Sequence, residues 1–178
     1  MRRREFITLL GGAAAMPTVT AGAQERMRRV GILTTSFGVD DPEMQTRNSA
    51  FILALQEFGW AEGKNVRVEF RAGGKASDLR KHAAELVSLA DVVLANGGQT
   101  VSALQDVSRT VPIVFVSVPD PVGAGFVDSL ARPGGNATGF TNFEYGIVAK
   151  WLELLKEVAP AGQVAVLRDP SNAAGSGQ

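Results

Sequence analysis

Small and polar residues follow a predicted buried strand at residues 92–95, in a position where they could hold a charged ligand. These residues are Asn96, Gly97, Gly98, Gln99 and Thr100. The apolar spacing that follows predicts a helix, and the first amides of a helix have no intrahelical acceptor. Because the helix dipole also favours negative charge there, the segment predicts a contact with a carboxylate or another anion. An ordinary turn capped by Thr100 explains the same residues equally well.

A carboxylate follows the next predicted strand, residues 113–116. Asp120 could accept hydrogen bonds from the amine of an amino acid. An Asp before Pro121 is also ordinary turn chemistry, and this interpretation is slightly favoured. Ser117 either contacts the ligand or only ends the strand. Hydroxyl groups follow the first predicted strand, residues 30–33, in the same way, and they either contact the ligand or are solvated in a loop. They belong to Thr34, Thr35 and Ser36.

Alternating strands and helices would position these loops. Asp41 followed by Pro42 predicts the start of a helix, whose apolar stripe runs to Phe58 and ends at Gly59. Residues 66–71 alternate between apolar and charged, which is typical of an edge strand, and Ser77 is the expected cap of the next helix. Right-handed crossovers then predict an α/β fold with a doubly wound parallel sheet in the strand order 2-1-3-4. In that order the loops listed above meet at one edge, where such sheets bind ligands.

Further elements are expected after Asp120. Residues 126–131 predict a short helix, and residues 138–140 a short strand. Thr141 and Glu144 have the spacing of a capping box, and the following segment has helical spacing that includes Trp151. Residues 164–167 predict one more strand, after which only a loop and a few residues remain.

The composition excludes several classes of protein. The chain has 178 residues, 18 basic and 18 acidic groups, one histidine and no cysteine, so there are no disulfides and there is no bias toward nucleic acid. His82 flanks an apolar helical stripe, and no GxSxG elbow or zinc spacing accompanies it, so we expect neither an enzyme nor a cofactor. A calcium site at the acidic run Asp40, Asp41 and Glu43 is a minor alternative, because helix starts favour acids anyway. No metal is expected.

Residues 1–23 have the pattern of an export signal. Three arginines precede a short apolar stretch, and small residues follow at 21–23. The arginine pair before Phe6 resembles the twin-arginine pattern, although a general secretory signal would look much the same. We therefore expect a periplasmic protein.

Longer motifs suggest a family. The segment VPIVFVSVPDPVGAGFVDSLARPGGNATGFTNFEY at 111–145 is followed by KWLELLKEVAP and VAVLRDPSN. With these motifs, residues 30–172 resemble the amino-terminal half of an ABC-transporter solute-binding protein of the type I periplasmic fold, in the group with tryptophan-binding members. The resemblance implies two α/β lobes with the ligand between them, and most of the second lobe is absent from this chain.

The resemblance also implies the organisation of the chain and its partners. Residues 1–23 would be the export signal, 24–140 the amino-terminal lobe, and 141–178 the hinge crossing and the incomplete start of a second lobe. Asn142 would lie at the hinge, where Phe143 or Tyr145 could cover an apolar ligand. The complete protein would be a monomer that delivers a small molecule, such as an amino acid or a related carboxylate, to an ABC permease. A ligand-sensing domain and an α/β enzyme remain the alternatives.

Overall fold

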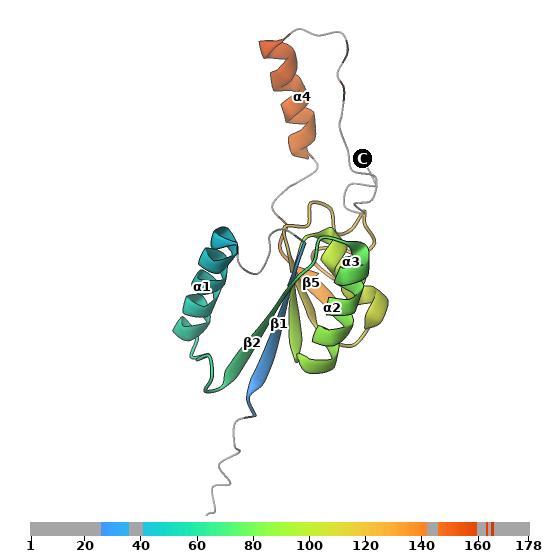
Figure 1. Cartoon of the computed structure of the whole chain (residues 1–178). Coiled ribbons are helices and arrows are strands. Elements are labelled where there is room, and N and C mark those ends of the chain that lie inside the picture. Colours follow the sequence, from blue (N-terminus) through green and yellow to red (C-terminus); the bar gives the residue numbers. More distant parts are fainter. Residues whose placement is uncertain (1–25, 36–40, 142–145, 160–162, 164, 166–178) are drawn as a thin grey trace, which may run out of the picture.

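The structure is a computed structural model, and it describes residues 26–35, 41–141, 146–159, 163 and 165. Strands and helices alternate through most of this part of the chain (Figure 1). The strands are β1 (Arg28–Thr34), β2 (Val66–Ala72), β3 (Val92–Asn96), β4 (Ile113–Val116) and β5 (Ala137–Gly139). The helices are α1 (Pro42–Glu57), α2 (Ala76–Leu89), α3 (Gly98–Val107) and α4 (Gly146–Val158).

The described strands form one parallel sheet in the order β2-β1-β3-β4-β5. The predicted order 2-1-3-4 is therefore confirmed, and the alternating strand β2 lies at the edge as expected. The edge is protected, because the Glu62 carboxylate accepts hydrogen bonds from the amide of Val68 at 3.0 and 3.3 Å. Protected edges are one way in which natural sheets avoid pairing with another chain.

The main hydrophobic core lies between the sheet and the pair α2 and α3, which cover one face (Figure 1). Leu33, Val93 and Phe115 point into it from three neighbouring strands and are 0–1% exposed. Leu86 and Leu104 meet them from the two helices and are fully buried. Alternate residues of a strand point to opposite faces, so the apolar run of each central strand supplies this face and the one behind it.

Helix α1 lies on the opposite face of the sheet and packs less closely (Figure 1). Asp41 is its N-cap, as predicted, and its carboxylate accepts from the amides of Glu43 at 2.8 Å and Met44 at 3.4 Å. Met44 is the one buried side chain of this helix. Phe58 was expected on the inward stripe, but this prediction is wrong: the side chain is 81% exposed, because the helix has already ended at its C-cap.

Two further local predictions are wrong. Residues 126–131 form turns instead of a helix: the amides of Phe126 and Val127 both donate to the Pro121 carbonyl, and both side chains are buried in the main core. Ser77 does not cap α2, because the helix begins one residue earlier and Lys75 is its N-cap. The Ser77 hydroxyl is 3.4 Å from a carboxylate oxygen of Asp78 instead.

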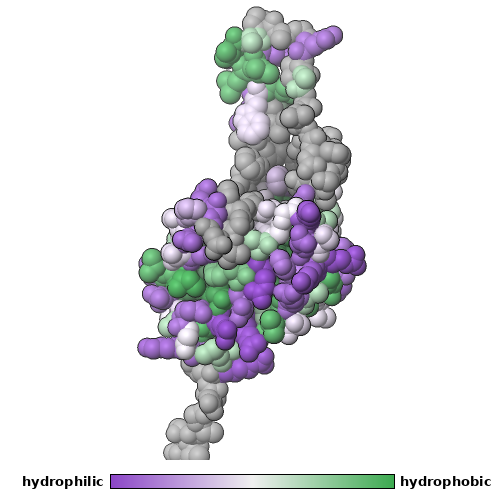
Figure 2. Space-filling model, in the orientation of Figure 1, coloured by the Kyte–Doolittle hydropathy of each residue, from purple (hydrophilic) through white to green (hydrophobic). Residues whose placement is uncertain are grey.

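Helix α4 stands apart from the sheet and exposes apolar side chains, which Figure 2 shows at the top of the view. Trp151 is 52% exposed and Val158 84%. No described helix combines the length and apolarity needed to cross a membrane. The predicted export signal, most of the capping box at 141–144 and most of the strand predicted at 164–167 lie outside the described residues.

Candidate functional site

The carboxyl ends of β1, β3 and β4 meet at one edge of the sheet. Thr34 is paired with Asn96, and Asn96 with Val116, so the loops after these strands start side by side. The amide of Gly97 donates to the Val116 carbonyl at 3.0 Å, which joins two of the loops directly. A methyl group placed on Gly97 would lie 3.6 Å from the Thr35 hydroxyl oxygen. The loops predicted to form a site are therefore neighbours, and we call this edge the rim.

The turn between β3 and α3 depends on Gly97. This residue is the N-cap of α3 and has φ +96°, a conformation that glycine adopts far more readily than other residues. Its carbonyl accepts from the amide of Thr100 at 3.2 Å and from the hydroxyl of Thr100 at 2.7 Å. The prediction that Thr100 is the cap is therefore wrong. Its side chain is fully buried and holds the turn from inside the first helical turn.

Helix α3 begins at Gly98, directly at the rim. The amides of Gly98 and Gln99 have no acceptor among the described residues, whereas the next two amides donate to the Gly97 carbonyl. A helix N-terminus with unused amides favours an anion. This part of the rim therefore has the chemistry expected for a carboxylate group.

Asp120 closes the rim on the β4 side. Its Oδ1 accepts from the amide of Gly123 at 2.8 Å, which confirms the turn interpretation. Its Oδ2 is buried and has no partner within the described part of the chain, and the residue is only 4% exposed. A buried carboxylate oxygen without a donor is costly to maintain. Asp120 is therefore both a turn residue and an unsatisfied acceptor.

Two further residues shape the loop between β4 and Asp120. Ser117 is exposed and has φ +57°, which is uncommon for a residue other than glycine. The hydroxyl of Thr141 donates to the Pro119 carbonyl at 3.3 Å and so ties the end of β5 to this loop. The sequence gives no sign that Thr141 belongs to the site, because only the fold brings it near Pro119. Ser36 and Asn142, which were predicted to contact ligand, lie outside the described residues.

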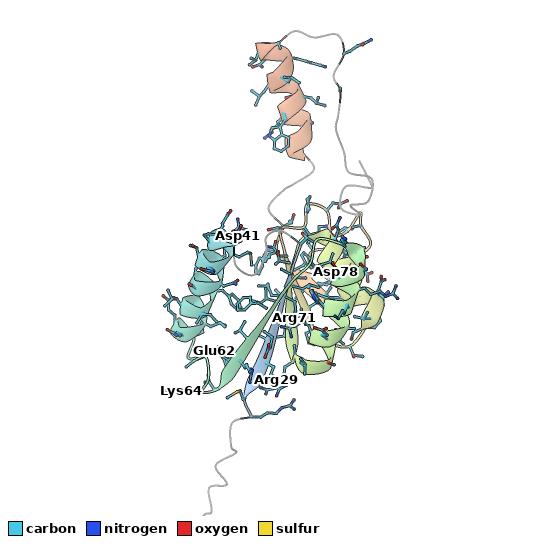
Figure 3. The ribbon with its side chains drawn as sticks, viewed as in Figure 1. Arg29, Asp41, Glu62, Lys64, Arg71 and Asp78 are labelled. Atoms are coloured by element: carbon cyan, nitrogen blue, oxygen red, sulfur yellow. The ribbon has the colours of Figure 1, made fainter. Side chains whose placement is uncertain are left out.

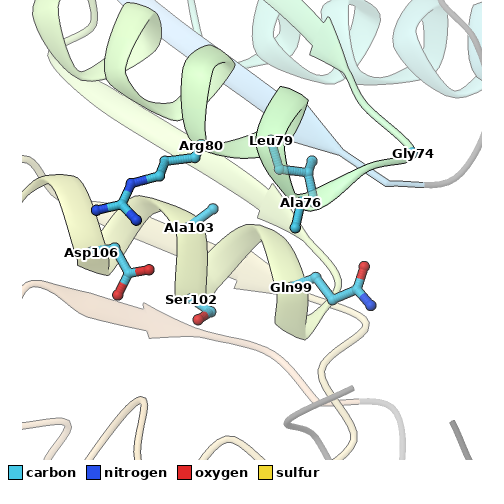
Figure 4. Close-up of a pocket in the computed structure, with 8 residues that line it drawn as sticks. All are labelled: Gly74, Ala76, Leu79, Arg80, Gln99, Ser102, Ala103 and Asp106. Carbon is cyan, nitrogen blue, oxygen red and sulfur yellow. The ribbon is translucent and has the colours of Figure 1, made fainter. Parts of the chain in front are cut away.

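Gln99 extends sideways from the rim, toward a hollow between α2 and α3 (Figure 4). The hollow has a volume of about 340 Å³. Arg80 and Asp106 lie on its two walls at the end away from Gln99. It is lined by Gly74, Ala76, Leu79, Arg80, Gln99, Ser102, Ala103 and Asp106.

The calcium alternative finds no support among the described acidic side chains. Asp41 caps α1, and Glu43 forms an ion pair with Arg47 at 2.6 Å. Asp40 lies outside the described residues. Within the described ranges no three histidine or acidic side chains gather in a way that could hold a metal ion.

Most of the chain is similar to proteins of known name or known structure. A relative from Clostridioides difficile, described as a tyrosine-binding protein, is 32% identical over 136 residues, which cover 75% of this chain and 39% of the relative. A conserved domain protein from Vibrio cholerae has a TM-score of 0.70 at 29% identity, over 83% of this chain and 49% of its own. A ligand-free, open substrate-binding protein with adhesive properties from Clostridium difficile has a TM-score of 0.60 at 30% identity, covering 75% and 44%.

A more distant solved structure shares the fold. It is an ABC domain from Streptococcus pneumonia in complex with L-Trp, with a TM-score of 0.62 at 24% identity over 75% of this chain and 44% of its own. The present chain thus spans less than half the length of these relatives. The family model described as ABC transporter substrate binding protein matches residues 31–177. The chain belongs to this family of substrate-binding proteins.

Proposed function

We propose that the chain supplies the amino-terminal lobe of a periplasmic protein that binds an amino acid and delivers it to an ABC permease. Residues 24–140 form this lobe, and residues 141–178 cross the hinge and start the second lobe. The observation that carries the proposal is the rim, where unused helix amides and an unsatisfied buried carboxylate lie on adjoining loops. The name of the tyrosine-binding relative supports an amino acid as the ligand.

An amino acid suits the rim because its two charged groups are opposite in sign to the groups found there. The ligand carboxylate accepts from the amides of Gly98 and Gln99 at the start of α3. The ligand ammonium group donates to Asp120 Oδ2, once the turn that covers this oxygen opens. The space around the ligand carboxylate and ammonium groups is limited by three neighbouring residues, Thr35, Asn96 and Ser117. Thr100 acts indirectly, by keeping the glycine turn in place.

The second lobe covers the ligand from the other side, and closure of the two lobes creates the form that the permease binds. An export signal at residues 1–23, of the twin-arginine or the general secretory type, would carry the complete, monomeric protein to the periplasm. If the complete protein binds at about 1 μM and this lobe supplies half of the binding free energy, the lobe alone binds at about 1 mM.

Titration calorimetry on the complete protein tests the proposal. The ligands are L-tyrosine, L-tryptophan, tyramine, which lacks the carboxylate, and 3-(4-hydroxyphenyl)propionate, which lacks the amine. We expect one amino acid to bind with 1:1 stoichiometry and both truncated analogues to bind more weakly. Asp120→Asn should weaken the amino acid by about 10- to 100-fold and leave the analogue without an amine unchanged, because a hydrogen bond to a charged group contributes about 1.5–3 kcal/mol.

Asp106→Asn is the matched control. Its carboxylate is exposed on α3, in the hollow of Figure 4, and it has no hydrogen-bond or ion-pair partner among the described residues. This variant should bind as the unmodified protein does. The proposal fails if no amino acid binds, if Asp120→Asn and Asp106→Asn behave alike, or if the amino acid is turned over instead of bound.

A further inference from the structure

A second, apolar pocket lies at the opposite end of the sheet from the rim, where β1, β2 and β3 begin. Its volume is about 450 Å³, within the range of roughly 300–1,000 Å³ typical of small-molecule sites. A smaller hollow of about 330 Å³ adjoins it and shares Arg28 and Trp60. The larger pocket is lined by Arg28, Arg29, Val30, Leu55, Trp60, Val66, Asp91 and Val92.

The pocket exists because the last turn of α1 does not close onto the sheet. Val30 and Val92 are only half-buried beneath this helix, whereas Val93 on the other face is fully buried. Leu55 faces the gap from α1 and is itself half-buried. Apolar side chains therefore surround a space that no described side chain fills.

The wall formed by Trp60 is held by an ordered turn. The Trp60 amide donates to the Leu55 carbonyl at 2.9 Å. The side chain of Asn65 bridges the same turn: its Oδ1 accepts from the Ala61 amide at 2.7 Å and its Nδ2 donates to the Gly59 carbonyl at 2.9 Å. The backbone that carries the indole is thus ordered before any ligand arrives, which lowers the entropy lost on binding.

The mouth of the pocket carries an excess of positive charge. Asp91 lies 3.4 Å from the guanidinium of Arg26 and 3.9 Å from that of Arg28, and it also accepts from the backbone amide of Arg29 at 2.8 Å. Arg28 lines both hollows and lies on the same face of the sheet as Val30 and Val66, whereas Arg29 lies on the opposite face with Leu33. Figure 3 shows Arg29 at the start of β1, at the end of the molecule away from Asp41. Two guanidinium groups, those of Arg26 and Arg28, therefore share one carboxylate, which leaves an excess of one positive charge.

We propose that this pocket binds an apolar molecule with a single anionic group, such as a medium-chain carboxylate. The chain packs against Leu55, Trp60 and Val92, and the anionic group pairs with Arg28. The site is independent of the amino-acid site, because the two lie at opposite ends of the same parallel strands. An apolar pocket with one charged group at its mouth selects both for a hydrophobic body and for the sign of the headgroup.

Fluorescence titration tests the inference. The chain has two tryptophans, so Trp151→Phe leaves Trp60 as the only indole. The probe is decanoate below its micelle concentration, and decanol and decyltrimethylammonium are compared with it at equal chain length. We expect a saturable change in Trp60 emission with decanoate, and binding at least about 5-fold weaker for the other two. Circular dichroism of each titrated sample checks that the fold is retained.

Two variants separate the pocket from non-specific adsorption. Arg28→Gln should weaken decanoate binding about 5- to 10-fold, whereas Arg109→Gln, at an exposed arginine that does not line the pocket, should change it less than 2-fold. Equal effects of the two variants, or equal binding of the three headgroups, would overturn the inference. So would the absence of a saturable response.

The test of the apolar pocket can succeed or fail independently of the test of the amino-acid site. Asp120→Asn should leave decanoate binding unchanged. If decanoate binds and no amino acid does, only the proposed function fails. If the complete protein binds an amino acid but not decanoate, another part of the protein covers the pocket and only this inference fails.

Discussion

Replacing Asp120 by asparagine should stabilise the ligand-free chain while it weakens ligand binding. The Asp120 carboxylate is buried, and Oδ1 alone has a donor, the amide of Gly123. Leaving a buried polar atom unsatisfied costs about 1–3 kcal/mol, and more when the group is charged. Asparagine keeps an oxygen for Gly123 and removes the charge, at the cost of a buried amide group of its own. We therefore expect the free energy of unfolding to rise by about 1 kcal/mol.

Thermal and urea unfolding measure the effect. For a domain of this size, about 1 kcal/mol corresponds to a Tm increase of roughly 3 °C, and the urea m-value should stay constant. Asp120→Ala removes the acceptor for Gly123 as well, so it should be about 1 kcal/mol less stable than Asp120→Asn. Asp106→Asn changes an exposed carboxylate and should stay within about 0.5 kcal/mol of the unmodified chain.

A decrease in stability on Asp120→Asn would refute this reasoning. It would mean that Oδ2 has a stabilising partner and is not an acceptor held ready for a ligand. In the presence of a saturating amino acid, the order of stabilities should reverse. The complete unmodified protein should then have a higher Tm than Asp120→Asn, because it binds the ligand more tightly and is stabilised more by it. This reversal is the expected signature of a binding group that is kept at the expense of stability.

The remaining predictions concern the backbone and the sheet edge. Gly97→Ala should lower the free energy of unfolding by about 1–2 kcal/mol, because φ is +96°, and circular dichroism during urea titration would measure it. Ser117→Gly should raise it by about 0.5–1 kcal/mol by relieving φ +57°, and a lower urea midpoint would contradict this. Asp41→Ala should lower it by about 1 kcal/mol through loss of the N-cap, with Asp78→Ala as a control that caps nothing. Glu62→Ala should expose the amide of Val68 and promote self-association, visible by light scattering; unchanged scattering at high concentration would argue against edge protection.

The order of the sheet could be predicted because its signals are local and strong. Buried parallel strands produce continuous apolar runs, and the alternation of β2 marked it as an edge. The start of α1 could be predicted for the same reason, since Asp41 and Pro42 act through their own neighbours. Given that order, the meeting of three loops at the rim follows from the geometry of parallel strands.

The errors arose where tertiary packing decided the local structure. Residues 126–131 were predicted to form a helix. Phe126 and Val127 are instead buried in the core by a turn in which both of their amides donate to the Pro121 carbonyl. Thr100 looked like a cap, yet two glycines precede it and Gly97 can adopt the required positive φ. The unsatisfied oxygen of Asp120 has no signal in the sequence, because it depends on which side chains surround the turn.

The two proposed sites differ in how the fold holds them, and this difference bears on what each can recognise. At the rim, the backbone amides at the start of α3 belong to a helix whose Val101 and Leu104 side chains are fully buried. Amides fixed in this way can hold the ligand carboxylate at one position, and Asp120 then selects a positive group beside it once its turn has opened. At the other end, the charge lies on Arg28, a long and exposed side chain that can follow its partner. The rim is therefore built for a specific molecule, and the apolar pocket for a class of molecules.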